Sequence, residues 1–120
     1  SVTANNTCGS STAQTLAITV NSIPAQPGTI SGNATICSGS LNTYSITSVA
    51  GATSYTWTLP SGWTGTSTTN SIDATASATS GDISVTANNE CGSSTAQTLA
   101  ITVNSIPAQP GTISGNVTIC

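Results

Sequence analysis

Lysine, arginine and histidine are absent from the sequence, and Asp73, Asp82 and Glu90 carry its only charged side chains. A chain without cationic side chains cannot neutralise phosphates, so we expect no nucleic-acid partner, and it cannot form the basic helix that binds a membrane surface. No apolar run approaches the roughly 20 residues that span a bilayer, so we expect no membrane insertion. Methionine is also absent, and we interpret the chain as an internal part of a longer protein.

The missing histidine and lysine also remove most catalytic chemistry. Neither a Ser-His-Asp nor a Cys-His arrangement can be built, and intramolecular isopeptide bonds are excluded because they require lysine. We interpret Asp73 and Asp82 as solvated surface charges rather than as an acid–base pair. Three scattered carboxylates do not supply the roughly six to eight oxygens that calcium takes, and the cysteines lack the C-x₂-C spacing of a zinc site. We therefore predict no catalytic residues, no metal site and no cofactor.

Serine and threonine dominate what is present, with 20 Ser and 24 Thr among 120 residues. Thr, Val, Ile, Tyr and Trp favour pleated strands, whereas strong helix formers are almost absent, so the composition predicts an all-β protein. Four cysteines in so polar a chain indicate an oxidising, extracellular compartment and disulfide bonds, with free buried thiols as the alternative. The disulfide candidates are Cys8, Cys37, Cys91 and Cys120.

A long internal repeat organises the sequence: residues 84–120 restate residues 1–37 with only two differences, Thr7 against Glu90 and Ala34 against Val117. One period therefore runs from a residue to its equivalent in the second copy. This repeat predicts that the chain is divided into three parts. Residues 24–106 form one complete repeat, residues 1–23 the last two strands of a preceding repeat, and residues 107–120 the first strand of a following one. Repeats this similar form quasi-one-dimensional arrays in which each module contacts its neighbours.

Apolar residues alternate with polar ones along several short segments of this period, as in strands with one buried face. About seven such segments, separated by turns every 8–12 residues or so, predict an immunoglobulin-like β-sandwich. Trp57, on the third strand, is expected to be the central core residue, and Leu41 belongs to the apolar face of the second strand. The predicted core residues are Tyr55, Trp57, Leu59, Ile83, Val85, Leu99, Ile101 and Val103.

The segment SYTWTLPSGW (54–63), followed by GDISVTANNECGSS (81–94), resembles the PKD-like, immunoglobulin-like repeats of Bacteroidetes surface proteins. In the parent PKD family the third strand carries Tyr-x-Trp-Asp-Phe-Gly-Asp-Gly. Tyr55, Trp57 and Gly62 match this motif, whereas both of its aspartates are missing here. The resemblance implies a tandem module of a very large secreted adhesin or gliding-associated protein. It further implies a place at the cell surface or in a secreted filament, reached through type IX secretion.

Two functions follow from this interpretation. The favoured one is a structural repeat that builds an extended stalk or filament, with neighbouring repeats of the same chain, and laterally associated chains, as its partners. The alternative is an adhesive module that binds surface glycans through Trp63 and the Ser/Thr/Asn-rich faces. Trp63 follows Pro60 and Gly62 in a loop, and packing beneath this loop is favoured over stacking against a sugar.

The cysteines allow two pairings that respect the repeat. A bond between Cys37 and Cys91 of one domain is the simpler one, but an immunoglobulin topology places these residues at opposite ends of the sandwich, roughly 20–30 Å apart. Bridged Cα atoms lie within about 7 Å of each other. Pairing Cys8 with Cys37, or Cys91 with Cys120, spans further still in a linear stack. A bond from Cys37 of one domain to the Cys91-type loop of the next is slightly favoured, and both pairings stay open at this point.

Overall fold

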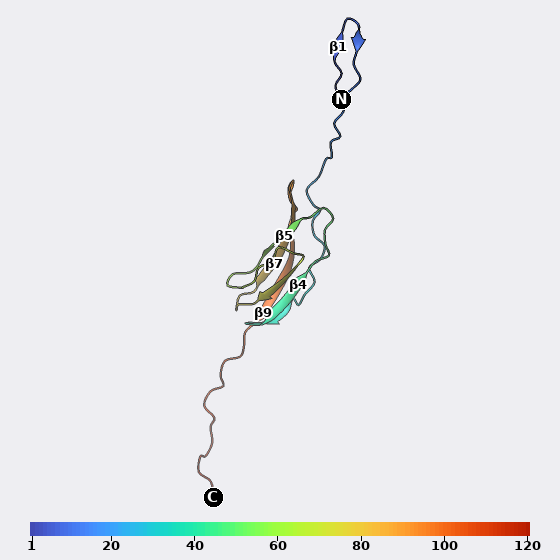
Figure 1. Cartoon of the computed structure of the whole chain (residues 1–120). Coiled ribbons are helices and arrows are strands. Elements are labelled where there is room, and N and C mark those ends of the chain that lie inside the picture. Colours follow the sequence, from blue (N-terminus) through green and yellow to red (C-terminus); the bar gives the residue numbers. More distant parts are fainter.

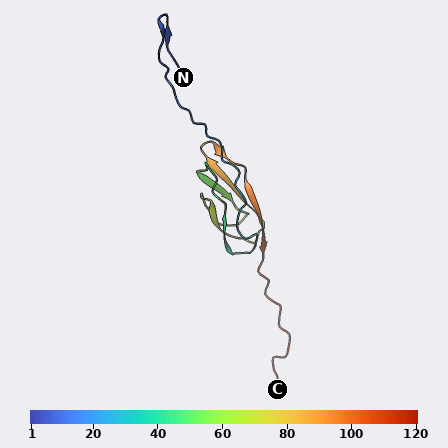
Figure 2. The same cartoon turned by 90° about the vertical axis from the view of Figure 1, so that its right-hand side faces the viewer.

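The computed structural model describes residues 1–120 and contains strands, turns and loops without any helix (Figure 1). Accordingly, no helix is long and apolar enough to cross a membrane. The molecule measures 124 × 20 × 16 Å along its principal axes. One domain occupies the middle of this length, and a thin segment of chain leaves each of its ends, as a second view also shows (Figure 2).

The domain is built from two sheets, which confirms the predicted all-β, immunoglobulin-like sandwich. The larger sheet has the strand order β3-β9-β7-β5, and β8 pairs with the end of β7. The smaller sheet pairs β4 with β6 and is widened by isolated bridges at Ser31 and Thr64. The strands are β3 (Thr35–Cys37), β4 (Leu41–Ser45), β5 (Ser54–Thr58), β6 (Ser71–Thr75), β7 (Gly81–Asn89), β8 (Gly92–Ser93) and β9 (Gln97–Asn104).

The first strand of the domain passes from one sheet to the other. Ser31 bridges Ser45 in the smaller sheet, and shortly afterwards β3 begins its parallel pairing with β9 in the larger one. Gly32 lies at the crossing with φ of 150°, and a Cβ at this position would overlap the ring of Tyr44. Glycine is needed here because it adopts this backbone conformation without a side chain to clash. The crossing brings the end of β3, and with it Cys37, beside the end of β9.

The core fills the space between the sheets and follows the period-2 alternation of the strands. Ile83, Val85 and Ala87 of β7 are each fully buried, which agrees with the face predicted for this strand. Of the other predicted core residues, Tyr55 and Ile101 are buried, while Leu59, Leu99 and Val103 are partly buried against the core. The remaining residues of the core cluster are Ile30, Ile36, Tyr44, Ile46, Trp63, Ile72, Ala74 and Ala76.

Two expectations for the apolar residues need correction. Trp57 is not the central core residue: it packs against the core only in part, and its Nε1–H donates to the carbonyl of Thr69 at 2.9 Å. β5 is the last strand of its sheet, and beyond it lies only the loop segment at residues 68–69, where the Thr68 carbonyl accepts the N–H of Tyr55 at 3.0 Å. Leu41 is 69% exposed because the alternation of β4 turns Tyr44 inward instead.

The N-terminal segment reproduces part of the domain in isolation. Its strands β1 (Asn5–Asn6) and β2 (Gly9–Ser10) form a hairpin with the register Asn5↔Ser10 and Asn6↔Gly9. β7 and β8 pair in the same way one period later, at 88↔93 and 89↔92. Because the hairpin forms without a sandwich around it, its geometry is determined by the local sequence.

Candidate functional site at the end of the domain

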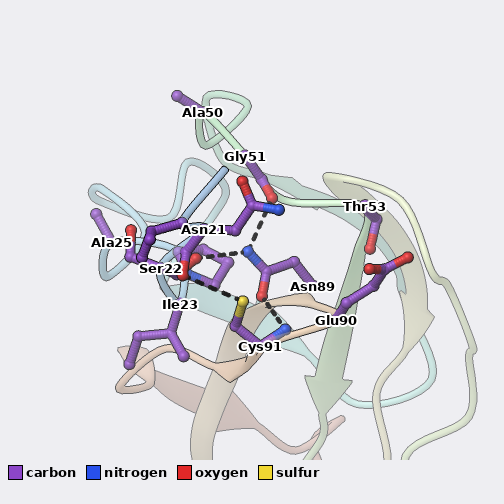
Figure 3. A pocket seen from close by; sticks show the side chains of 12 residues that line it. Asn21, Ser22, Ile23, Ala25, Ala50, Gly51, Thr53, Asn89, Glu90 and Cys91 are labelled. Carbon is purple, nitrogen blue, oxygen red and sulfur yellow. Dashed lines mark hydrogen bonds between the residues drawn. The ribbon is translucent and has the colours of Figure 1, made fainter. Parts of the chain in front are cut away.

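A groove of about 730 Å³ lies where the N-terminal segment meets the domain (Figure 3). Residues 20–25 of the entering chain form one wall, and the loops at residues 50–53 and 89–91 form the other. Its only ionisable carboxylate is that of Glu90, and it contains no cation. The groove thus lies between the domain and the entering chain, whose residues 20–30 are called the connector below.

Asn89 links the two walls of this groove. Its side-chain Nδ2 donates to the carbonyl of Ser22 at 2.8 Å and to the carbonyl of Gly51 at 3.2 Å. Its Oδ1 accepts the backbone N–H of Cys91 at 2.9 Å, which fixes the turn between β7 and β8. One amide side chain therefore shapes its own turn and also holds the entering chain (Figure 3).

The equivalent asparagine in the N-terminal hairpin separates these two roles. Asn6 Oδ1 accepts the N–H of Cys8 at 2.8 Å, which is the same turn contact one period earlier. Because this turn forms without a domain beneath it, the Asn-x-Cys turn is intrinsic to the sequence. Asn89 has two additional contacts: the one to Ser22 crosses the junction, and the one to Gly51 joins two loops of the domain.

Cys91 lies directly against the entering chain. Its Sγ donates to the carbonyl of Asn21 at 3.4 Å, within the longer distance that a sulfur hydrogen bond allows. The neighbouring Gly92 has φ of 140°, and a Cβ there would come within 3.2 Å of the Ile23 side chain. The backbone of the Cys91 turn therefore lies close against the connector, with little room for a side chain at Gly92.

The connector continues along the domain after leaving the groove. Pro24, Pro27 and Ile30 are buried, whereas the residues between them are exposed. A three-residue period is that of polyproline II, which turns every third side chain to the same side. Gln26, between the two prolines, donates through Nε2 to the carbonyl of Ala96 at 2.8 Å. The connector is thus docked on the sandwich along its length and does not act as a free tether.

Trp63, the proposed glycan contact, is not available to a ligand. Its side chain is only 8% exposed, and its Nε1–H donates to the carbonyl of Thr79 at 2.9 Å. The turn that starts at Pro60 folds the chain back, with the N–H of Trp63 bonded to the Pro60 carbonyl and Gly62 at φ of 79°, so the indole lies under the loop. The adhesive interpretation therefore loses the aromatic residue on which it depended.

All four cysteines are exposed free thiols in the structure. Cys37 lies beside Asn104 at the end where the chain leaves the domain, and Cys91 lies at the end where it enters. The eight residues of β9 alone span about 26 Å at ~3.3 Å each. This separation is incompatible with a Cys37–Cys91 bond within one folded domain, because bridged Cα atoms lie within about 7 Å.

Sequence reasoning missed Asn89, although it found the cysteine that follows shortly after it. The repeated Asn-Asn-x-Cys-Gly segment does carry a signal for the turn, since asparagine side chains often bond the backbone two residues on. The contact to Ser22 carries no local signal, because its partner lies 67 residues away along the chain. No three His, Cys, Asp or Glu side chains come together in the structure to form a metal site.

Comparison with known proteins agrees with this architecture. A family model described as a PKD-like domain matches residues 23–101, which covers most of the connector and nearly the whole sandwich. No curated protein matches the chain. The matched segment is well over half of the sequence, and the chain therefore belongs to the PKD-like domain family.

Proposed function

We propose that the chain is a structural repeat of a long extracellular protein and that successive repeats form an extended stalk or filament. PKD-like domains occur in extracellular proteins as structural modules, and the match of residues 23–101 to that family supports this role. In the proposal, residues 24–106 are the complete repeat, and residues 1–23 and 107–120 belong to its neighbours. A bacterial cell-surface or filament location and type IX export are part of the same proposal, on the strength of the sequence resemblance.

The observation that carries the proposal is the path of the chain through the domain. The chain enters at the groove beside Asn89 and leaves at the opposite end, after Asn104 (Figure 2). When the chain enters a domain at one end and leaves it at the other, each added domain lengthens the array along the long axis of the domain. The docked connector, with Pro24 and Pro27 buried, fixes the direction in which the preceding repeat continues.

The exposure of apolar residues in the two terminal segments supports neighbouring repeats as the proposed partners. In the N-terminal segment Ile18 is 78% exposed, whereas its counterpart one period later, Ile101, is 3% exposed. In the C-terminal segment Ile113 is 95% exposed, whereas its counterpart Ile30 is 3% exposed. The same side chain in the same sequence context is buried once its repeat is complete. Neighbouring repeats of the same chain are thus the partners that these segments fit.

Solution scattering tests the proposal directly. Tandem proteins containing one to four copies of residues 24–106 should increase in maximum dimension by roughly 40 Å per copy, from nine residues of β7 at ~3.3 Å plus the connector. A radius of gyration that grows as for a compact sphere would refute the stalk. Sedimentation velocity on the same series reports lateral association, and saturable binding on a glycan array would revive the adhesive role through the Ser/Thr/Asn-rich faces.

A further inference from the structure

We infer that a disulfide joins Cys37 of each repeat to Cys91 of the repeat that follows it, so that a covalent bond crosses every junction. The inference rests on the proposed tandem arrangement. It is based on the surroundings of the backbone carbonyl at one position of the repeat, and this position occurs twice in the chain. Asn104 and Asn21 occupy the same position in the period, as Cys120 and Cys37 do.

Asn104 shows what surrounds this carbonyl inside a complete repeat. β3 runs parallel to β9, and Cys37 is the direct partner of Asn104 in their register. The N–H of Ser38 donates to the Asn104 carbonyl at 2.9 Å. Cys37 is exposed at this end of the sandwich. Each complete repeat thus holds Cys37 one strand spacing, about 4.8 Å, from its Asn104.

Asn21 shows what the following repeat contributes to the same carbonyl. Here the Sγ of Cys91 donates to the Asn21 carbonyl at 3.4 Å (Figure 3). The turn that carries Cys91 is fixed by Asn89 Oδ1, while the Nδ2 of Asn89 holds the next carbonyl, that of Ser22. The thiol is therefore oriented toward the junction by two contacts that do not involve sulfur.

In an array of repeats, both cysteines therefore lie beside the same asparagine. In the preceding repeat, the residue equivalent to Cys37 pairs with Asn21 by the register seen for Asn104, and Cys91 reaches the same Asn21 from the other side of the junction. The proposed bond requires the two Cα atoms to lie within about 7 Å of each other at this asparagine. Each sulfur is exposed and has no cysteine partner within its own domain.

The chemistry of the step is an exchange between thiols and a disulfide. A small-molecule disulfide is attacked by the thiolate of one cysteine, and the resulting mixed disulfide is then attacked by the thiolate of the other. One S–S bond forms across the junction, the two cysteines lose two protons and two electrons, and the small disulfide is reduced to two thiols.

The proposed bonds overlap along the chain and limit how far an array can be stretched. Only the segment 91–120 separates Cys91 from Cys120, and Cys120 is the Cys37 of the next repeat. In a bonded array, the shortest covalent path across two repeats therefore consists of one disulfide and this single segment. The segment measures about 100 Å when fully extended. Without the bonds, the same two repeats extend to roughly 580 Å. The bonded array is therefore nearly inextensible even when its domains unfold.

A tandem protein tests the pairing. A second copy of residues 24–106 is inserted after Ile106, and Cys8 and Cys120 are replaced by serine. The folded protein is oxidised with a small disulfide and cleaved in dilute acid at the aspartyl bonds of Asp73 and Asp82. We expect the fragment holding Cys37 of the first copy to be linked to the fragment holding Cys91 of the second, and two thiols to be lost per molecule.

Matched variants make the result specific. Replacing Cys91 of the first copy and Cys37 of the second with serine should leave the bond intact, because neither faces a complete junction. Replacing Cys37 of the first copy and Cys91 of the second should abolish it. A link between Cys37 and Cys91 of the same copy, or four free thiols after oxidation, overturns the inference. Scattering on the reduced protein assesses the stalk separately, since an elongated shape without the bond refutes only the disulfide.

Force spectroscopy measures the mechanical consequence. Pulling on an oxidised array of several repeats should show almost no gain in contour length. Adding a reductant should restore roughly 250 Å per unfolded repeat, which is the chain of one period at ~3.5 Å per residue less its folded length. Equal gains before and after reduction would show that no bond spans the junctions.

Discussion

Replacing Asn89 with alanine should loosen the junction without disrupting the domain, and Asn6→Ala is its matched control. The two asparagines occupy the same position of the repeat and form the same turn, with N–H···O distances of 2.9 Å at Cys91 and 2.8 Å at Cys8. Only Asn89 has the contacts to Ser22 and Gly51. The difference between the variants therefore reports the contacts that Asn89 makes within the domain and to the connector, chief among them the two hydrogen bonds donated by its Nδ2.

The magnitude follows from the number and exposure of these bonds. A neutral hydrogen bond contributes about 0.5–1.5 kcal/mol, and the exposed setting of both contacts favours the lower half of this range. Asn89→Ala should thus lower the free energy of unfolding by about 1–2 kcal/mol more than Asn6→Ala, which should lie near zero. The bond to Ser22 alone is worth about 1 kcal/mol, so the connector should open about fivefold more often.

Two assays read the two effects. Urea unfolding followed by tryptophan fluorescence measures the stability of the domain, and ¹⁵N relaxation measures the order of residues 20–23. In Asn89→Ala the backbone order parameters of residues 20–23 should fall toward the flexible range, below about 0.6, while those of β7 and β9 stay high. Unchanged order at residues 20–23 would refute the assignment of Asn89 as the residue that holds the connector. So would equal destabilisation by Asn6→Ala.

The remaining predictions concern the core and its pH dependence. Trp63→Ala should cost about 3–5 kcal/mol and lower the melting temperature more than Trp57→Ala, whose ring is only partly buried; the reverse order would contradict the packing described here. Gly32→Ala should destabilise the domain by more than about 1 kcal/mol in urea unfolding, whereas Gly28→Ala, with nothing near its Cβ, should not. Burial raises the pKa of Tyr44, so the folded state holds its proton more tightly than the unfolded state, and stability should fall as pH rises above about 10. A urea titration series should show this loss in the natural chain and not in Tyr44→Phe.

The sequence was sufficient to predict which face of a strand is buried, because alternation is a local property. It correctly placed Ile83, Val85 and Ile101 in the core. It did not rank Trp57 and Trp63 correctly, since alternation shows the face of a strand and not whether that strand lies at the edge of a sheet. Trp63 is buried by a turn that folds its loop back over the sandwich, and no periodic pattern reports such a turn.

The candidate site was harder to predict, because its parts come from opposite ends of one period. The turn at Asn89 can be recognised in the Asn-Asn-x-Cys segment, which occurs twice. Its contact with Ser22 depends on where the connector docks, and docking depends on the three-residue spacing of Pro24, Pro27 and Ile30. Two prolines in a short linker indicate stiffness, but they do not show against which surface the stiff segment lies.

The fold, rather than distance along the chain, selects the partner of each cysteine in the proposed array. In an unfolded chain, Cys37 is nearer along the sequence to Cys91 of its own repeat than to that of the next, which lies one full period further on. Loop closure then favours the wrong bond by about 0.8 kcal/mol, or roughly fourfold, because the two loops hold about 54 residues and about 137 residues. Folding reverses this preference completely, because the sandwich holds Cys37 and Cys91 of one repeat at opposite ends. It also leaves Cys91 beside Asn21. The equivalent of Asn21 one period later is Asn104, which pairs with Cys37. The junction bond therefore requires that folding precede oxidation, and the Asn-x-Cys turn assists because it forms even where no domain surrounds it.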